Sequence, residues 1–276
     1  MKILTGGCSF TAHQLEENLA WPNHLNHDVT NTAEMASGNM IILDRIMSKL
    51  NSTFDFCIVM WSSPYRVEFL LNNELSNYDY ILDKMKDSPA ISNYQLTGEN
   101  KVINEGSNWL RVGGGYGKWK FDVDEVDDIV EAYYKYIHNL EFQFIQTLKS
   151  IILLQNYCKV NNIKIINTCW GNIFDIVKEE DDRASGSNIF ASKESMELLK
   201  NGTWKQHPII DLYPNARQWY DKIDWSNWLF YENDYVKRGG LGEYAIIECN
   251  DDYDKGMHPS ANSQKKWASF IENNLI

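Results

Sequence analysis

The run Phe54–Trp61 (FDFCIVMW) is apolar at nearly every position. A strand with two apolar faces is typical of the centre of a parallel sheet that is covered by helices on both sides. A second such run, Ile163–Thr168, follows a segment from about Val123 to Val160 whose apolar spacing predicts a long helix. The chain also opens on a short apolar strand at Lys2–Leu4. This succession of strand, helix and strand predicts an α/β fold with a mainly parallel sheet.

Two loop-rich segments, at about 75–122 and 175–248, interrupt the pattern. We interpret them as insertions into a single α/β domain that spans residues 1–276, a length that is sufficient to bury a large core. The segment Ser260–Leu275 places Trp267, Phe270 and Ile271 on one face, which predicts a closing amphipathic helix.

Composition excludes several classes of function. The chain has 26 Lys and Arg against 38 Asp and Glu, a net charge of −12, so we expect no nucleic-acid partner. No apolar run approaches ~18 residues, so we expect no membrane partner. The five cysteines lack metal-site spacing, and we expect reduced thiols, no metal and no cofactor. Because the first strand begins at Lys2, we also expect no signal peptide.

The two ends of the chain carry the residues with chemistry. Gly7-Cys8-Ser9-Phe10-Thr11 follows the first strand, and Asp254 and His258 lie close to the C-terminus. A serine, a histidine and an aspartate that meet in space form a nucleophile, a base and the carboxylate that orients the base. The alternatives are an N-cap serine, a histidine that caps the last helix, and Cys8 as a thiol nucleophile.

These blocks, together with Ser37-Gly38-Asn39, resemble those of the SGNH/GDSL hydrolase superfamily. With Trp61-Ser62-Ser63-Pro64 and His258-Pro259-Ser260 added, the combination is similar to SGNH-like proteins of tailed bacteriophages. The resemblance implies a three-layer α/β/α sandwich (a flavodoxin-like SGNH fold) with Ser9 as nucleophile, His258 as base and Asp254 as its orienting acid. It also implies that the amides of Ser9 and Gly38 bind the oxyanion.

The chain departs from the family pattern in two places. An asparagine is expected after the third strand, where this chain has Ser62. Asn39 and Ser62 are therefore the candidates for the missing oxyanion donor. Asp254 also precedes His258 by four residues where the family has three, which leaves Asp251 and Asp252 as substitutes.

Other polar and aromatic residues are candidates for substrate contacts. Trp61 and Arg66 lie at the end of the third strand, although Arg66 has a possible ion-pair partner in Glu68. The second insertion holds four tryptophans: Trp204, Trp219, Trp225 and Trp228. Their rings either stack on a sugar or form a small core of the insertion itself.

The sequence thus predicts a serine esterase or deacetylase whose first-choice substrate is an O-acylated carbohydrate. Two alternatives stay open: transfer of the acyl group to an acceptor other than water, and a catalytically weak or inactive glycan-binding or phage structural module. The expected partner is a small-molecule or glycan ester, and the expected location is the host cytoplasm or the virion. The sequence does not determine the oligomeric state.

Overall fold

A computed structural model describes residues 1–12, 20–35, 37–70, 109–114, 117–118, 124–178, 184–185, 197, 199–202, 206–251 and 258–275. Its main sheet has four parallel strands in the order β2-β1-β3-β7. The strands are β1 (Lys2–Gly6), β2 (Asp28–Asn31), β3 (Phe56–Trp61) and β7 (Lys164–Cys169). All residues of β3 are buried, which confirms the central strand expected from its apolar run.

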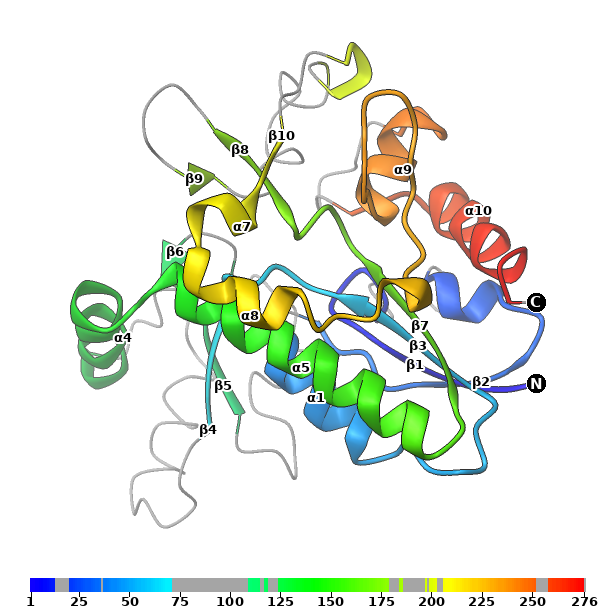
Figure 1. The fold of residues 1–276 in the computed structure, drawn as a ribbon, viewed down its shortest axis with the longest axis horizontal. Helices are drawn as coiled ribbons and strands as arrows, with labels where there is room; N and C mark the ends of the chain where they lie inside the picture. Colours follow the sequence, from blue (N-terminus) through cyan, green and yellow to red (C-terminus); the bar gives the residue numbers. More distant parts are fainter. Residues whose placement is uncertain are drawn as a thin grey trace.

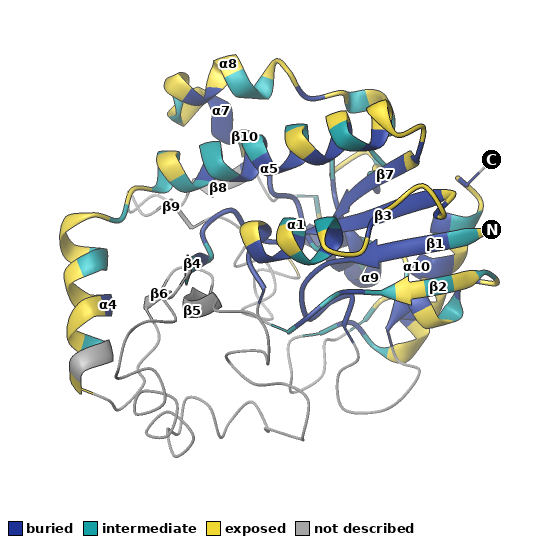
Figure 2. Ribbon diagram, turned by 90° about the horizontal axis from the view of Figure 1, so that it is seen from below, coloured by how far each residue is buried: buried dark blue, intermediate teal, exposed yellow. Residues whose placement is uncertain are grey.

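Helices cover both faces of this sheet (Figures 1 and 2). One face carries α1 (Asn39–Met47) and α5 (Leu140–Val160), which pack on each other. The other carries α9 (Leu241–Ile247), α10 (Ala261–Glu272) and the 3-10 turn η1 (Trp21–His24). The predicted three-layer α/β/α architecture of the flavodoxin-like type is confirmed.

The long helix expected between about Val123 and Val160 is in fact two helices, α4 (Asp124–Tyr136) and α5. Asn139 causes the break, because its backbone is extended (φ −137°, ψ 117°) and its side chain accepts a hydrogen bond from the Phe142 amide at 2.8 Å. An asparagine in this position satisfies an amide that would otherwise lack a partner at the start of a helix. Apolar spacing continues across the break, so periodicity alone did not reveal it.

Replacing Asn139 by alanine is expected to lower the free energy of unfolding by about 1 kcal/mol, because the first turn of α5 loses its cap. Urea denaturation followed by circular dichroism measures the change. Asn156, an exposed asparagine in the interior of α5, is the matched control, and its alanine variant is expected to lose no stability. Equal losses in the two variants would contradict the capping role.

Each of the two predicted insertions takes part in a small antiparallel sheet. The first sheet is β4-β5-β6, in which β4 (Val67–Leu70) precedes the insertion, whereas β5 (Trp109–Gly114) and β6 (Gly117–Lys118) belong to it. The second is β10-β8-β9, made of β8 (Asp175–Lys178), β9 (Ala184–Ser185) and β10 (Gln206–Pro208). Four short helical turns lead from β10 toward α9: α7 (Ile209–Leu212), η3 (Pro214–Ala216), α8 (Arg217–Tyr220) and η4 (Trp225–Asn227).

Three of the four tryptophans named in the second insertion, Trp219, Trp225 and Trp228, pack against the main hydrophobic cluster. Trp225 and Trp228 each lie with ring centroids 5.0 Å from the buried ring of Phe174, and Trp228 stacks on Phe230 at 5.0 Å. Both indoles are only partly exposed and pack against the main hydrophobic cluster. Trp204 lies outside the described residues. The packing role therefore accounts for Trp225 and Trp228 without a sugar.

Among the residues that the structure describes, none of the helices combines the length and the apolar character that a bilayer crossing requires.

Candidate active site

Ser9 lies in a tight turn at the carboxyl end of β1. The amides of Thr11 and Ala12 both donate to the carbonyl of Cys8, each at 2.9 Å, so the chain begins a helical turn directly after the strand. Gly7 makes this turn possible, since a Cβ there would lie 2.3 Å from the Thr11 hydroxyl oxygen. The turn brings Ser9 to the edge where open parallel sheets place their sites.

His258 meets Ser9 from the other end of the chain. Its Nε2 lies 2.9 Å from the Ser9 Oγ, within hydrogen-bond distance. The imidazole also packs against Phe10, with ring centroids 4.8 Å apart, and Phe10 packs against Trp170 at 5.0 Å. A base within hydrogen-bond reach of a hydroxyl is the geometry that proton abstraction needs. Ser9 itself is only 7% exposed.

Asp251 anchors the segment that carries His258. Its Oδ2 accepts hydrogen bonds from the Ser260 amide at 2.7 Å and from the Ser263 hydroxyl at 2.6 Å, at the start of α10. This oxygen therefore binds donors at the N-terminus of α10. Asp254, the predicted orienting acid, and Asp252 lie outside the described residues.

Replacing Asp251 by alanine is expected to lower the free energy of unfolding by about 1–3 kcal/mol, because two donors lose a charged acceptor. Chemical denaturation of both proteins measures the difference. Asp128, an exposed acid on α4, provides the matched control, and its alanine variant should unfold as wild type does. An Asp251→Ala protein as stable as that control would show that these two hydrogen bonds do not hold the segment.

Gly38 holds a carboxylate in this structure. The Gly38 amide donates to Oε1 of Glu68, and the Ile41 amide donates to Oε2 of the same side chain at 3.1 Å. A Cβ at Gly38 would lie 2.6 Å from the Glu68 carboxyl carbon, so glycine is what permits the close approach. The amide predicted to bind an oxyanion is thus already in use. Arg66, a predicted substrate contact, is half-buried and donates from Nη1 to the Ser37 carbonyl at 3.0 Å.

Asn39 is a cross-link and not a donor to an oxyanion. Its Nδ2 donates to the Ser62 carbonyl at 3.0 Å and to the Thr147 Oγ1 at 2.9 Å, which uses both amide hydrogens. Its Oδ1 accepts from the Ser62 amide at 2.8 Å. The side chain therefore ties α1 to the end of β3 and to α5. The prediction that Asn39 replaces the missing donor is wrong for this conformation.

Two further predicted site residues lie inside the protein. Ser62 is fully buried, so its hydroxyl does not reach a bound substrate in this conformation. Trp61 is also fully buried, and its Nε1 donates to the Oδ1 of Asn167 at 2.9 Å. Its predicted contact with substrate is corrected to a core position, because strand β3 is covered on both faces. Cys8 is fully buried as well, within the main cluster, which removes it as a presented thiol.

A buried polar network beyond β7 escaped the sequence interpretation. Glu243 accepts from the amides of Asn172 at 2.8 Å and Gly240 at 2.9 Å, and Asp175 pairs with Arg238 at 2.9 Å. Burial raises the pKa of both carboxyls, Glu243 and Asp175. The spacing Gly240-x-x-Glu243, in which a helix-start glutamate reaches back to the cap amide, was the available signal. The network supports the loop that bears Trp170, and Trp170 packs on Phe10 beside His258.

No group of three or more His, Cys, Asp or Glu side chains suited to a metal ion occurs among the described residues.

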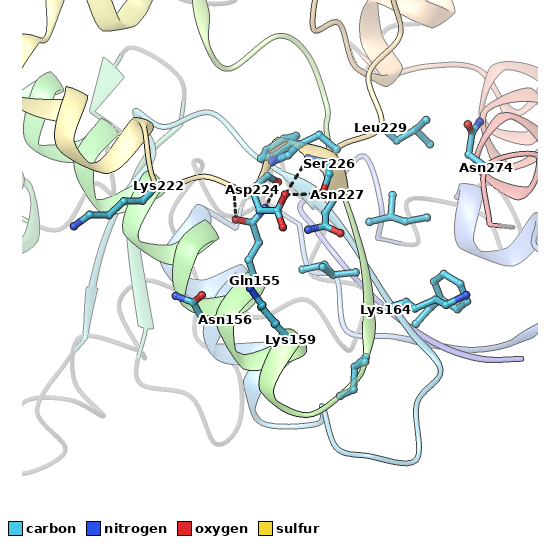
Figure 3. A pocket seen from close by; sticks show the side chains of 15 residues that line it. Gln155, Asn156, Lys159, Lys164, Lys222, Asp224, Ser226, Asn227, Leu229 and Asn274 are labelled. Atoms are coloured by element: carbon cyan, nitrogen blue, oxygen red, sulfur yellow. Dashed lines mark hydrogen bonds between the residues drawn. The ribbon is translucent and has the colours of Figure 1, made fainter.

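A groove of about 650 Å³ lies elsewhere, between α5, β7 and η4 (Figure 3). Gln155 and Asp224 exchange two hydrogen bonds at its side, at 2.8 and 3.1 Å. Its lysines do not converge: the Lys164 Nζ lies 5.1 Å from the Phe56 ring centroid, and Lys222 extends away from the groove with its Nζ 4.8 Å from that of Trp219. None of the residues that line it belongs to the Ser9–His258 site.

No protein-family model matches the sequence, and no curated protein matches it. Among solved structures, one from Bacteroides fragilis, described as a "putative acylhydrolase", aligns over 99% of this chain and 85% of its own, at 13% identity and a TM-score of 0.40.

Proposed function

We propose that this protein is a serine hydrolase that cleaves esters, with Ser9 as nucleophile and His258 as general base. The observation that carries the proposal is the 2.9 Å separation of the Ser9 Oγ and the His258 Nε2. These two residues come from opposite ends of the chain, and both belong to the motifs that suggested acyl transfer. Burial of Cys8 leaves Ser9 as the nucleophile of this turn.

The proposed reaction has two steps. The Ser9 Oγ attacks the ester carbonyl carbon while its proton passes to the His258 Nε2. The tetrahedral intermediate collapses to an acyl-enzyme, and the protonated imidazole gives its proton to the leaving alkoxide. Water then attacks the acyl-enzyme with His258 again as base, which releases the acid and restores Ser9. In this proposal Asp254 orients the imidazole, and the Ser9 amide is the first oxyanion donor.

The test is turnover of an activated ester. Wild type is expected to release p-nitrophenol from p-nitrophenyl acetate with saturable kinetics, and Ser9→Ala is expected to fall to the rate of the uncatalysed reaction. A Cys8→Ser variant is the control for thiol chemistry and should retain activity if it folds. Identical rates for wild type and Ser9→Ala would refute the proposal.

The substrate belongs to the proposal as well, and an O-acetylated carbohydrate remains the first one to test. Because Trp225 and Trp228 serve the core, their presence does not single out a sugar ester. Release of acetate from O-acetylated glycans, measured beside short-chain aliphatic esters, decides between these classes. Addition of alcohols to the same assays separates hydrolysis from acyl transfer, since a transferase forms the ester of the added alcohol.

A specific observation also favours the second candidate, a binding or structural module with little activity. The Gly38 amide is occupied by Glu68, and both amide hydrogens of Asn39 are used inside the protein. Loss of one oxyanion donor lowers turnover by ~100–1000-fold, so two missing donors would leave a very slow enzyme. Binding to a glycan array without acetate release would support this candidate.

A further inference from the structure

The segment after β3 clamps the turn that precedes α1. Arg66 donates to the Ser37 carbonyl, Glu68 accepts from the Gly38 and Ile41 amides, and Ser62 exchanges two hydrogen bonds with Asn39. These five hydrogen bonds hold residues 37–39 and Ile41. Glu68 differs from Arg66 and Ser62 in bringing a carboxylate to amides at the N-terminus of a helix.

The clamped turn is joined to the turn of Ser9. The Glu34 amide donates to the Gly7 carbonyl at 3.2 Å, and the Ser37 amide donates to the Glu34 carbonyl at 3.4 Å. Two backbone hydrogen bonds thus connect the residue before Gly38 to the glycine that opens the Ser9 turn. Both turns lie at the carboxyl edge of the sheet, where β1 and β2 are neighbours.

The strand that carries Glu68 has an irregularity at this residue. In β4, Val67 pairs with Gly113 and Glu68 pairs with Arg111, so the register shifts between the two positions. A shift of this kind changes the direction of a side chain relative to the rest of its strand. The position of the Glu68 carboxylate therefore depends on how β4 pairs with β5, which is part of the first insertion.

We propose that Glu68 occupies the oxyanion site in the resting protein, and that acyl transfer at Ser9 requires this carboxylate to leave the Gly38 amide. The inference rests on the proposed function. Anions bind at helix N-termini because the amides there point outward and the helix dipole favours negative charge. A carboxylate and a developing oxyanion compete for the same amide, and they also repel each other. In this proposal β4 moves relative to α1, and this movement frees the Gly38 amide from the Glu68 carboxylate so that it can bind the oxyanion.

The experiment compares the rate at which a fluorophosphonate labels Ser9 in four proteins: wild type, Glu68→Ala, Glu68→Gln and Ser9→Ala. In this reaction the Ser9 Oγ forms a bond to phosphorus, fluoride leaves, and the hydroxyl proton passes to His258. The phosphonyl oxygen needs the same amides as an ester oxyanion, and intact-protein mass measures the adduct. Glu232→Ala removes one negative charge from an exposed position and serves as the matched control.

We expect the fluorophosphonate to label Glu68→Ala at least about 10-fold faster than wild type. The reason is that one restored oxyanion donor can raise the rate of acyl transfer by up to ~100–1000-fold. Glu68→Gln, which keeps the shape and loses the charge, should lie between the two. Sodium acetate should slow labelling of Glu68→Ala by entering the vacated amides, and leave wild type unchanged. A residue with only a structural role would not produce this response to acetate.

The outcomes separate the two proposals. If Ser9 is labelled in wild type and the Glu68 variants react at the same rate or more slowly, the occupancy inference is overturned and the nucleophile assignment stands. If no protein is labelled, the proposed function fails and takes the inference with it. Thermal melts check that each variant is folded, and Glu68→Gln decides the question if Glu68→Ala does not fold.

Discussion

Replacing His258 by alanine is expected to lower kcat/KM for ester hydrolysis by about 10²–10⁴-fold, because Ser9 loses the base that accepts its proton. The loss should be larger for an ethyl ester than for p-nitrophenyl acetate. A p-nitrophenolate ion leaves without a proton, whereas an alkoxide needs the one that the imidazole returns. Initial rates with the two substrates measure both losses, and His207, an exposed histidine on β10, gives the matched alanine control.

A double variant of Ser9 and His258 gives a stricter test, because the effects of the two substitutions should not add. Ser9 and His258 act as one unit in the proposed mechanism, so the double alanine variant should lose no more activity than the worse single variant. Losses that multiply would mean that the two side chains act independently. Unchanged activity in His258→Ala would remove the base from the mechanism, although the 2.9 Å contact would remain a structural fact.

Replacing Trp61 by alanine is expected to lower the free energy of unfolding by about 3–5 kcal/mol, because the largest side chain type is removed from a fully buried position. The Oδ1 of Asn167 also loses the indole donor that now lies 2.9 Å away. Trp61→Phe keeps most of the volume and loses that donor together with part of the ring, so a smaller cost of about 1–3 kcal/mol is expected. Urea denaturation of the two variants measures both costs.

The control for Trp61 is an exposed aromatic residue. Tyr136 is 73% exposed, and its alanine variant should stay within about 0.5 kcal/mol of wild type. If Trp61→Ala were as stable as wild type and instead raised KM, the indole would contact the substrate. The core position assigned to Trp61 would then be wrong.

Much of the layered fold could be predicted, for reasons visible in particular elements. The apolar run of β3 can be satisfied only between two layers of helices, so its position at the centre of a parallel sheet follows from the hydrophobic effect alone. The interruption between α4 and α5 could not be read from apolar spacing, because that spacing runs through Asn139 and only the cap geometry ends one helix and starts the next.

For the candidate site, too, some features follow from the sequence and others only from the tertiary structure. The residue types and order of the terminal motifs were enough to single out Ser9 and His258 as a pair, since the chemistry of a hydroxyl and an imidazole belongs to the side chains themselves. How Gly38, Asn39, Ser62 and Trp61 are used was decided by the tertiary structure, because each has several potential hydrogen-bond partners. Which partner is chosen depends on residues far away in the chain, such as Glu68, Thr147 and Asn167. The sequence by itself therefore determined the layered sheet and singled out Ser9 and His258 as the proposed reactive pair. The tertiary structure alone decided which hydrogen-bond donors near them are already used, because a donor binds the acceptor that lies closest in space.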